Sequence, residues 1–411
     1  VGAYHPDQLG INRPHPELAH FRTPVKGLYL CGSSNHGGGV SPIIDDGRVI
    51  LPADEDGESF LAALDPASGE VLWRSERADA RAAFSTPCQF VDPSGTRGLL
   101  FNSMSHGISF VDPATGKTLW EQGELFEMRT ISSSLVADGL VIAGSEKVSI
   151  HALREVGYLA RKLLANRPDV MRDLLEKRKM FVAVMAYCEL QTDLPDCRGM
   201  SLWWAYRARG LGSRPVSCGE ENVLNFSGDP WEGENIFIHE FAHGIQGIIG
   251  GIDDQFDVRL RALYDKAKQS GRFGGYAIGG GYGEFWAEGV QAWFNCNGTV
   301  RPKSGGGQSS FEVLGPQGEH VCHLRTREQI RTHMPENAKL LDNAFGQNKW
   351  VYVPLAERLD EPHLSGFDPA EAPTFRWPPA VVEAFNRIEA FNRIEAEKKA
   401  ARAAERQRQS E

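Results

Sequence analysis

Two copies of one short segment constrain the fold of this chain more than any other feature of its sequence. Asp65-Pro-Ala-Ser-Gly-Glu-Val-Leu-Trp73 recurs as Asp112-Pro-Ala-Thr-Gly-Lys-Thr-Leu-Trp120. Each copy follows a strand-like run, and its Asp-Pro and Ser-Gly or Thr-Gly steps are typical of turns between short strands. A further strand start of the same kind occurs at Ser134. Internal repetition predicts stacked copies of one structural unit, so we expect residues 41–150 to be β-rich.

The repeated segment resembles the PQQ-like β-propeller repeat through its matched D-P-A-S/T-G-x-x-L-W pattern. Propellers typically close with ~4–8 blades, whereas this chain has two copies and a fragment. The resemblance therefore implies a partial propeller rather than a quinone-dependent enzyme, with the Trp that ends each copy packed between neighbouring blades. Because a blade buries its faces only against its neighbours, we expect this segment to lean on the rest of the chain or on another chain.

Residues 1–40 contain a second resemblance. The stretch Thr23-Pro-Val-Lys-Gly-Leu-Tyr-Leu-Cys-Gly32, with the glycines that follow it, resembles the C-terminal flavin-contacting stretch of phytoene-desaturase-like flavoproteins. Those families bind the dinucleotide with a strand–GxGxxG–helix unit, and no such unit precedes this stretch. We expect residues 1–40 to be a fragment without a working flavin site. The simplest alternative is an extended strand and a glycine-rich loop.

The periodicity of the sequence changes at about residue 151. Apolar residues recur at helical spacing from Val156 and again after Pro168, and residues 181–187 form a short apolar run typical of a buried strand. This order predicts an α+β domain over residues 151–390. A tandem duplication of Glu-Ala-Phe-Asn-Arg-Ile then leads into a charged helical tail over residues 391–411, to which we attach no function.

His239-Glu240-Phe-Ala-His243 forms an HExxH pattern inside a run of helical periodicity, which Asp229 and Pro230 are suited to begin. On a helix, His239 and His243 lie at i and i+4 on one face. Two neutral imidazoles in this position can reach one Zn2+ ion about 2.0–2.1 Å away. Glu240 lies beside them, where its carboxylate can accept a proton from a zinc-activated water. The alternative is a core helix with two hydrogen-bonded histidines and a surface glutamate.

A second helical pattern begins near Glu284-Phe-Trp-Ala-Glu288, and aromatic residues cover most of its circumference. Glu284, Glu288 and Gln291 share the remaining narrow face, which is either the solvent side or a buried polar stripe. The aromatic residues favour burial, where a carboxylate needs a metal or a partner. Catalytic zinc takes three protein ligands, and a downstream Glu can supply the third. A carboxylate one turn later can accept the Nδ1–H of a ligating His.

Together, HEFAH and EFWAE resemble the gluzincin metallopeptidases. The resemblance implies a zincin-like domain in which Glu284 is the third zinc ligand beside His239 and His243. It also implies that Glu240 is the general base and that Glu288 orients a ligating His. The implied activity is zinc-dependent hydrolysis of a peptide bond in a peptide or protein substrate.

Gluzincin sites often add a Tyr or His that hydrogen-bonds the developing oxyanion. We assign this role to Tyr276, and Tyr282 stays open as the alternative because the glycines between the two leave the alignment ambiguous. His320, Cys322 and His323 form another small cluster of metal-ligating residue types. Because no matching second pair accompanies them, a structural or exposed role is the preferred interpretation.

Two other classes of function remain open from the sequence. The chain could be a non-catalytic protein-binding module, in which the propeller-like strands bind a partner and the metal site is structural. It could also derive from a fused or misassembled reading frame, in which residues 1–150 contribute nothing to activity. The base Glu240 favours the enzyme, because a purely structural zinc site needs no acid beside its ligands.

Charge and cysteine content restrict the partners of this chain. The net charge of −10 argues against nucleic acid, which requires clustered Lys and Arg. No apolar run approaches the ~18 residues of a membrane-spanning helix. The seven cysteines are scattered without a CxxC pair, which argues against a thiolate zinc site, although Cys188 and Cys197 could close a short loop. We expect a periplasmic or extracellular location.

Overall fold

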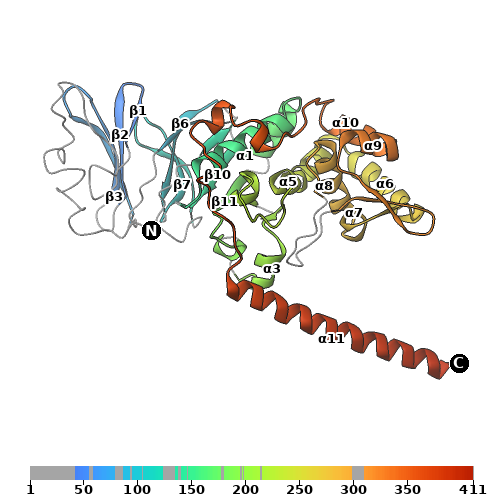
Figure 1. Cartoon of the computed structure of the whole chain (residues 1–411). Helices are drawn as coiled ribbons and strands as arrows, with labels where there is room; N and C mark the ends of the chain where they lie inside the picture. The colour runs from blue at the N-terminus through green and yellow to red at the C-terminus, as the bar shows by residue number, and fades with distance from the viewer. Residues whose placement is uncertain are drawn as a thin grey trace.

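The protein has a β-rich N-terminal region and a mixed α/β C-terminal region, seen side by side in Figure 1. In the computed structural model the described residues are 42–54, 59–78, 87–92, 95–103, 105–123, 135–137, 140–145, 147–176, 180–194, 197, 199–212, 215–298 and 310–410. The flavoprotein-like stretch of residues 1–40 lies outside them. The predicted α+β class is confirmed in its coarse form, as a mixed fold with antiparallel sheets toward the N-terminus.

The β-rich region consists of two four-stranded antiparallel sheets, each with its strands in sequence order. The first contains β1 (Ile43–Asp45), β2 (Arg48–Ala53), β3 (Ser59–Leu64) and β4 (Val71–Arg77), and the second contains β5 (Cys88–Val91), β6 (Arg97–Ser103), β7 (Gly107–Val111) and β8 (Thr118–Gln122). The repeated segments form the turns between the third and fourth strands of each sheet. Asp65 closes its turn by accepting hydrogen bonds from the backbone of Ala67 and Ser68, and Asp112 does the same with Ala114.

The Trp residues of the two repeats have different surroundings. Trp73 packs between the two sheets, as predicted: its Nε1 donates to the carbonyl of Pro113 over 3.0 Å. Its ring lies so close to Gly116 that a Cβ there would be 2.4 Å away, and Gly116 also has a φ of +73°. Trp120 is 38% exposed and packs on Phe110 of its own sheet. The expectation for Trp120 is therefore wrong, because the element beyond the second sheet is not another copy of the repeat.

The second sheet is covered on both faces. Ile50 and Leu61 of the first sheet pack with Leu99 and Phe101 on one face. On the other face, Phe90, Phe110 and their neighbours pack against Val141 and Ala143. The incomplete propeller-like segment thus leans on the C-terminal region, which supplies the apolar surface that a further blade would otherwise supply.

That apolar surface belongs to a five-stranded sheet in the order β12-β13-β11-β10-β9. Its strands are β9 (Leu135–Ala137), β10 (Leu140–Gly144), β11 (Phe181–Met185), β12 (Gly210–Leu211) and β13 (Val216–Gly219). Residues 134–143 were expected to start a third propeller repeat, but β10 instead pairs in parallel with β11, Val141 opposite Phe181. A continuous apolar run such as that of β10 suits a parallel strand buried on both faces. The sheet therefore crosses the domain boundary expected at residue 150.

Helices cover the rest of this sheet and form the large core. α1 (Ile150–Leu163) and α2 (Pro168–Glu176) connect β10 to β11, which confirms the two predicted helices and the predicted strand. The remaining helices and short strands are α3 (Leu202–Arg207), α4 (Glu220–Val223), α5 (Ile236–Ile252), α6 (Phe256–Ser270), β14 (Phe273–Gly274), α7 (Tyr276–Gly279), α8 (Tyr282–Trp293), β15 (Glu312–Leu314), β16 (His320–His323), α9 (Arg327–His333), α10 (Pro335–Ala344) and α11 (Pro379–Ser410).

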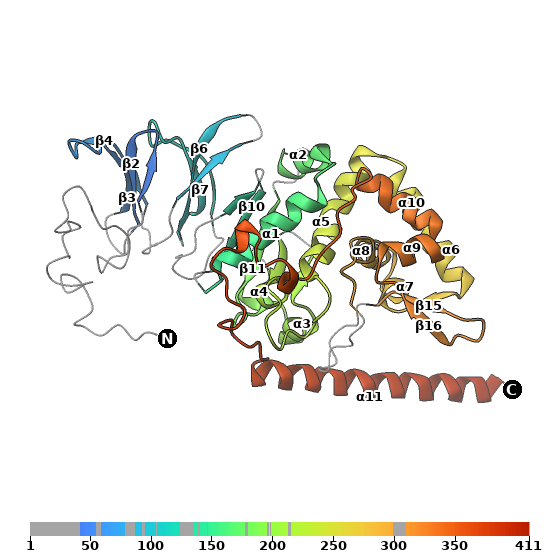
Figure 2. The same cartoon turned by 45° about the horizontal axis from the view of Figure 1, so that its top comes forward.

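The long helix α11 carries the tandem duplication and extends away from the body of the protein in both views (Figures 1 and 2). The two copies of the duplicated segment have different surroundings. Phe385 of the first copy is buried, and its ring lies 4.3 Å from that of Tyr206 on α3. The equivalent Phe391 is 62% exposed. A six-residue repeat is not a multiple of the helical turn, so the second copy faces another direction.

Removal of β9 and β10 should unfold the C-terminal region. A fragment of residues 151–411 lacks Leu140 and Ile142, both fully buried, and each such side chain contributes roughly 1.5–3 kcal/mol. It also leaves an unpaired edge on β11. We expect a fragment of residues 131–411 to show a cooperative thermal transition by circular dichroism and the shorter fragment to show none. Melting of both fragments within a few degrees of each other would contradict this role of β10.

Candidate metal centre

Helix α5 carries the HExxH segment and begins at Ile236. Its N-cap is Asn235, whose side-chain oxygen accepts from the backbone of Ile238 over 3.0 Å. The expected start at Asp229 and Pro230 is wrong. Gly233 has a φ of +90°, which a right-handed helix cannot contain, and Asp229 instead accepts a hydrogen bond from the backbone of Trp231.

Three donor atoms converge between α5 and α8. Nε2 of His239 lies 3.2 Å from Nε2 of His243 and 3.1 Å from Oε2 of Glu284. The third separation, between His243 Nε2 and Glu284 Oε2, is 3.5 Å. Donors held tetrahedrally at zinc distances are about 3.3 Å apart. The three side chains therefore suit one small divalent cation with a fourth position open.

Helix α8 positions Glu284 by packing tightly against α5. Phe285 and Trp286 are buried, and Trp286 Nε1 donates to the carbonyl of Ala242 on α5 over 2.8 Å. Glu288 and Gln291 are fully buried as well. The polar face of α8 is therefore a buried stripe and not the solvent side, as the surrounding aromatic residues predicted.

Gln291 orients the imidazole of His239. Its side-chain amide nitrogen donates to the carbonyl of Asn235 over 3.1 Å, so its oxygen is the atom that lies 2.9 Å from His239 Nδ1. That oxygen can only accept, so Nδ1 must carry the proton and Nε2 is directed toward Glu284 and His243. A ligating His requires this tautomer.

Glu288, which was expected to orient a ligand, lies against another partner. Its Oε2 accepts from the side-chain amide of Asn297 over 2.8 Å. The reasoning from sequence placed Gln291 on the correct face of α8 but preferred a carboxylate for the role. The available signal was the spacing of seven residues from Glu284 to Gln291, which is two helical turns.

Glu240 is partly buried beside the two histidines. One of its carboxylate oxygens and the ring nitrogens of His239 and His243 all lie within 4.8 Å of one another. Burial raises the pKa of the Glu240 carboxyl, although the charges of the two histidines lower it. A base in catalysis works best when its pKa lies near the operating pH, so the upward shift suits proton transfer.

The two candidate tyrosines point to different neighbours. The Tyr276 hydroxyl interacts with Glu284 and Arg207, and burial together with the Glu284 charge raises the pKa of the phenol. The Tyr282 hydroxyl accepts from Arg261 on α6 over 2.6 Å, with the guanidinium stacked 3.7 Å from the ring centroid. The structure therefore places Tyr276 at the three-donor centre and Tyr282 in a contact with α6.

The other candidate clusters do not form a comparable centre. Within the described part of the chain, the group of three that could hold a metal is His239, Glu240 and His243. His320 and His323 stack with ring centroids 4.4 Å apart on β16. The six cysteines among the described residues are all free, so the loop expected between Cys188 and Cys197 is not closed.

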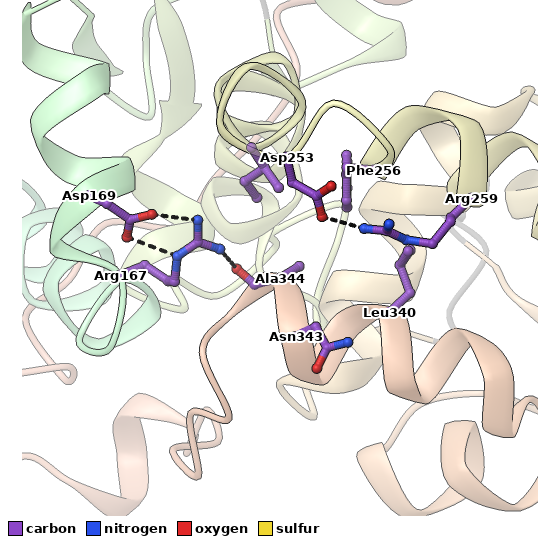
Figure 3. Close-up of a pocket in the computed structure, with 9 residues that line it drawn as sticks. Arg167, Asp169, Asp253, Phe256, Arg259, Leu340, Asn343 and Ala344 are labelled. Atoms are coloured by element: carbon purple, nitrogen blue, oxygen red, sulfur yellow. Dashed lines mark hydrogen bonds and ion pairs between the residues drawn. The ribbon is translucent and has the colours of Figure 1, made fainter.

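A separate pocket lies between α2, α6, α10 and the end of α5 (Figure 3). Its charged residues already pair with one another: Arg167 binds Asp169 at 2.8 Å and Arg259 contacts Asp253. No residue of the three-donor centre lines it. Since its charges are balanced, we assign it no ligand.

Gln291→Met should weaken zinc binding about 10- to 100-fold, because loss of a partner that orients a ligand typically costs that much. Met has a similar volume but cannot accept from His239 Nδ1. Glu288→Gln is the matched control on the same buried face, and we expect it to change the affinity far less. Competition with a chromophoric chelator measures both. A larger loss in Glu288→Gln would return the orienting role to the carboxylate.

Comparison with known proteins bears on the N-terminal region. Residues 19–159 match the PQQ_2 family, described as outer membrane protein assembly factor BamB, which confirms the PQQ-like repeats. The match extends through β10 into α1 and ends before the three-donor centre.

Short segments resemble oxidoreductases. One of 40 residues is 58% identical to pyridine nucleotide-disulfide oxidoreductase domain-containing protein 2 of Mus musculus and of Rattus norvegicus. Another, of 39 residues, is 46% identical to a limonene dehydrogenase component of Castellaniella defragrans. Each match covers 10% of this chain, which spans only 7% of the length of these relatives. Among the described residues, no helix combines the length and apolar character needed to span a membrane.

Proposed function

We propose that the C-terminal region is a zinc metallopeptidase of the gluzincin kind. The single observation that carries the proposal is the convergence of His239, His243 and Glu284 within 3.1 to 3.5 Å of one another, with the carboxylate of Glu240 beside them. A structural zinc site is usually closed by a fourth protein ligand, whereas a catalytic site keeps one position open. Three donors with an adjacent acid match the catalytic arrangement.

Each residue has a distinct task in this proposal. His239, His243 and Glu284 would hold Zn2+, which when bound supplies Lewis acidity and lowers the pKa of water. Glu240 accepts the proton of the attacking water and returns it to the leaving amine, which its raised pKa favours. Tyr276 donates its hydroxyl proton in a hydrogen bond to the developing oxyanion.

The second candidate is a non-catalytic protein-binding module, which the PQQ_2 match over residues 19–159 favours. In that case the propeller-like sheets bind the partner and the metal only stabilises the fold. A chance fusion of unrelated segments is less favoured, because the parallel pairing of β10 with β11 makes the two regions share one sheet.

The test is digestion of a complex peptide mixture by the purified, zinc-supplemented chain. New peptide termini read by mass spectrometry should accumulate with time and disappear when the metal is chelated. The Glu240→Gln variant, purified in the same way, controls for contaminating peptidases. Equal cleavage by both proteins, or no cleavage by either at full zinc occupancy, would favour the binding module.

A further inference from the structure

Arg207 places a positive charge next to the three-donor centre. It is the last residue of α3, and its guanidinium carbon lies 5.2 Å from the centroid of the Tyr276 ring. The guanidinium also interacts with the Tyr276 hydroxyl, and its charge acts on the carboxyl of Glu240. Arg207 therefore faces the same space as the oxyanion donor and the base of the proposed reaction.

Unlike other arginines of the C-terminal region, Arg207 is not committed to a carboxylate. Arg209 binds Glu221 at 2.6 Å, and Arg358 pairs with Glu155. In the part of the chain that the structure describes, Arg207 is only partly buried and forms no ion pair; its neighbour is the neutral Tyr276. A guanidinium in such a place has its fork of donors available for a planar anion from outside the protein.

The same helix adds an apolar surface beside this charge. Trp204 lies three residues before Arg207, so the two side chains share one side of α3, and Trp204 is 42% exposed. Trp203 and Tyr206 on the same helix pack instead toward Phe385 of α11, which lies next to α3 in both cartoon views (Figures 1 and 2). An exposed indole next to an arginine suits a ligand that joins an apolar group to an anion.

We propose that Arg207 binds a carboxylate of the substrate and so determines which peptides the centre accepts. This inference rests on the proposed peptidase function. In a peptide, the carboxylate is carried by the C-terminus or by an acidic side chain near the bond to be cleaved. A C-terminal carboxylate at Arg207 would restrict cleavage to bonds near the end of the chain, with the adjoining apolar side chain on Trp204.

Binding can be measured without turnover in the full-length, zinc-loaded Glu240→Gln protein. Fluorescently labelled peptides with a free C-terminus should bind about 10- to 100-fold more tightly than their C-terminal amides, the ratio expected for a hydrogen bond to a charged group. In the same background, Arg207→Met should abolish the preference, and Arg207→Lys should retain part of it. Arg387→Met, an exposed arginine on α11, is the matched control and should leave the preference intact.

The outcomes separate this inference from the proposed function. Amides that carry one internal Glu distinguish the two sources, because they recover the affinity only if a side-chain carboxylate is recognised. Equal binding of all the peptides, or a preference that persists in Arg207→Met at unchanged zinc content, overturns the inference even if the wild-type chain hydrolyses peptides. An Arg207-dependent preference in a chain that hydrolyses nothing supports carboxylate binding and contradicts the peptidase alone. If Arg207→Met does not fold, a preference undiminished in Arg207→Lys overturns the inference and a reduced one supports it.

Discussion

His239→Ala should lower the affinity of the protein for zinc by more than about 100-fold. Even loss of a group that only orients a ligand costs 10- to 100-fold, and this change removes a direct donor that lies 3.1 and 3.2 Å from the other two. We expect the wild-type chain to retain one zinc ion per molecule after dialysis, measured by elemental mass spectrometry. His320→Ala removes an exposed histidine on β16 and should retain the metal.

The same titration should depend on pH. In the metal-free centre burial lowers the pKa of His239, but the hydrogen bond to Glu284 and the surrounding carboxylates raise it to about 10. The pKa of Glu284 is held well below its usual range by both histidines, so this carboxylate needs no deprotonation near neutrality. Zinc must therefore displace the proton of His239, and its affinity should fall about tenfold for each pH unit from 8 to 6. A pH-independent affinity, or stoichiometric zinc in His239→Ala, would contradict this centre.

Glu240→Gln should keep the zinc and lose peptide hydrolysis, with kcat/KM reduced about 10²- to 10⁴-fold, the usual contribution of a general base. The amide occupies the same volume but cannot accept a proton, and Glu240 is not one of the three converging donors. Hydrolysis of a peptide identified in the digestion experiment and zinc content are measured on the same sample.

The control for Glu240→Gln is Glu232→Gln, which alters an exposed carboxylate just before α5. It should change neither quantity. Near wild-type turnover by Glu240→Gln would remove Glu240 from the mechanism. Loss of zinc in that variant would instead make Glu240 a ligand, a role that its position within 4.8 Å of both histidines permits.

Parts of this protein were predictable because they depend on local periodicity and turn chemistry. The Asp-Pro and Ser-Gly or Thr-Gly steps predicted the strand connections that Asp65 and Asp112 close. A spacing of four residues on a helix predicted that the side chains of His239 and His243 lie together. The aromatic residues around Glu284 predicted a buried helix, because a circumference that is mostly apolar must be removed from water.

The sequence by itself thus determined the elements and which residues share a face, since these follow from backbone geometry over a few residues. Only the tertiary structure decided which elements meet. The rotation of α8 against α5 brings Gln291, and not Glu288, to His239 Nδ1, and the path of α7 turns Tyr276 toward Glu284 while Tyr282 contacts Arg261. The parallel pairing of β10 with β11 likewise joins residues 40 apart. Such choices depend on the packing free energy of the whole core, which no local pattern contains.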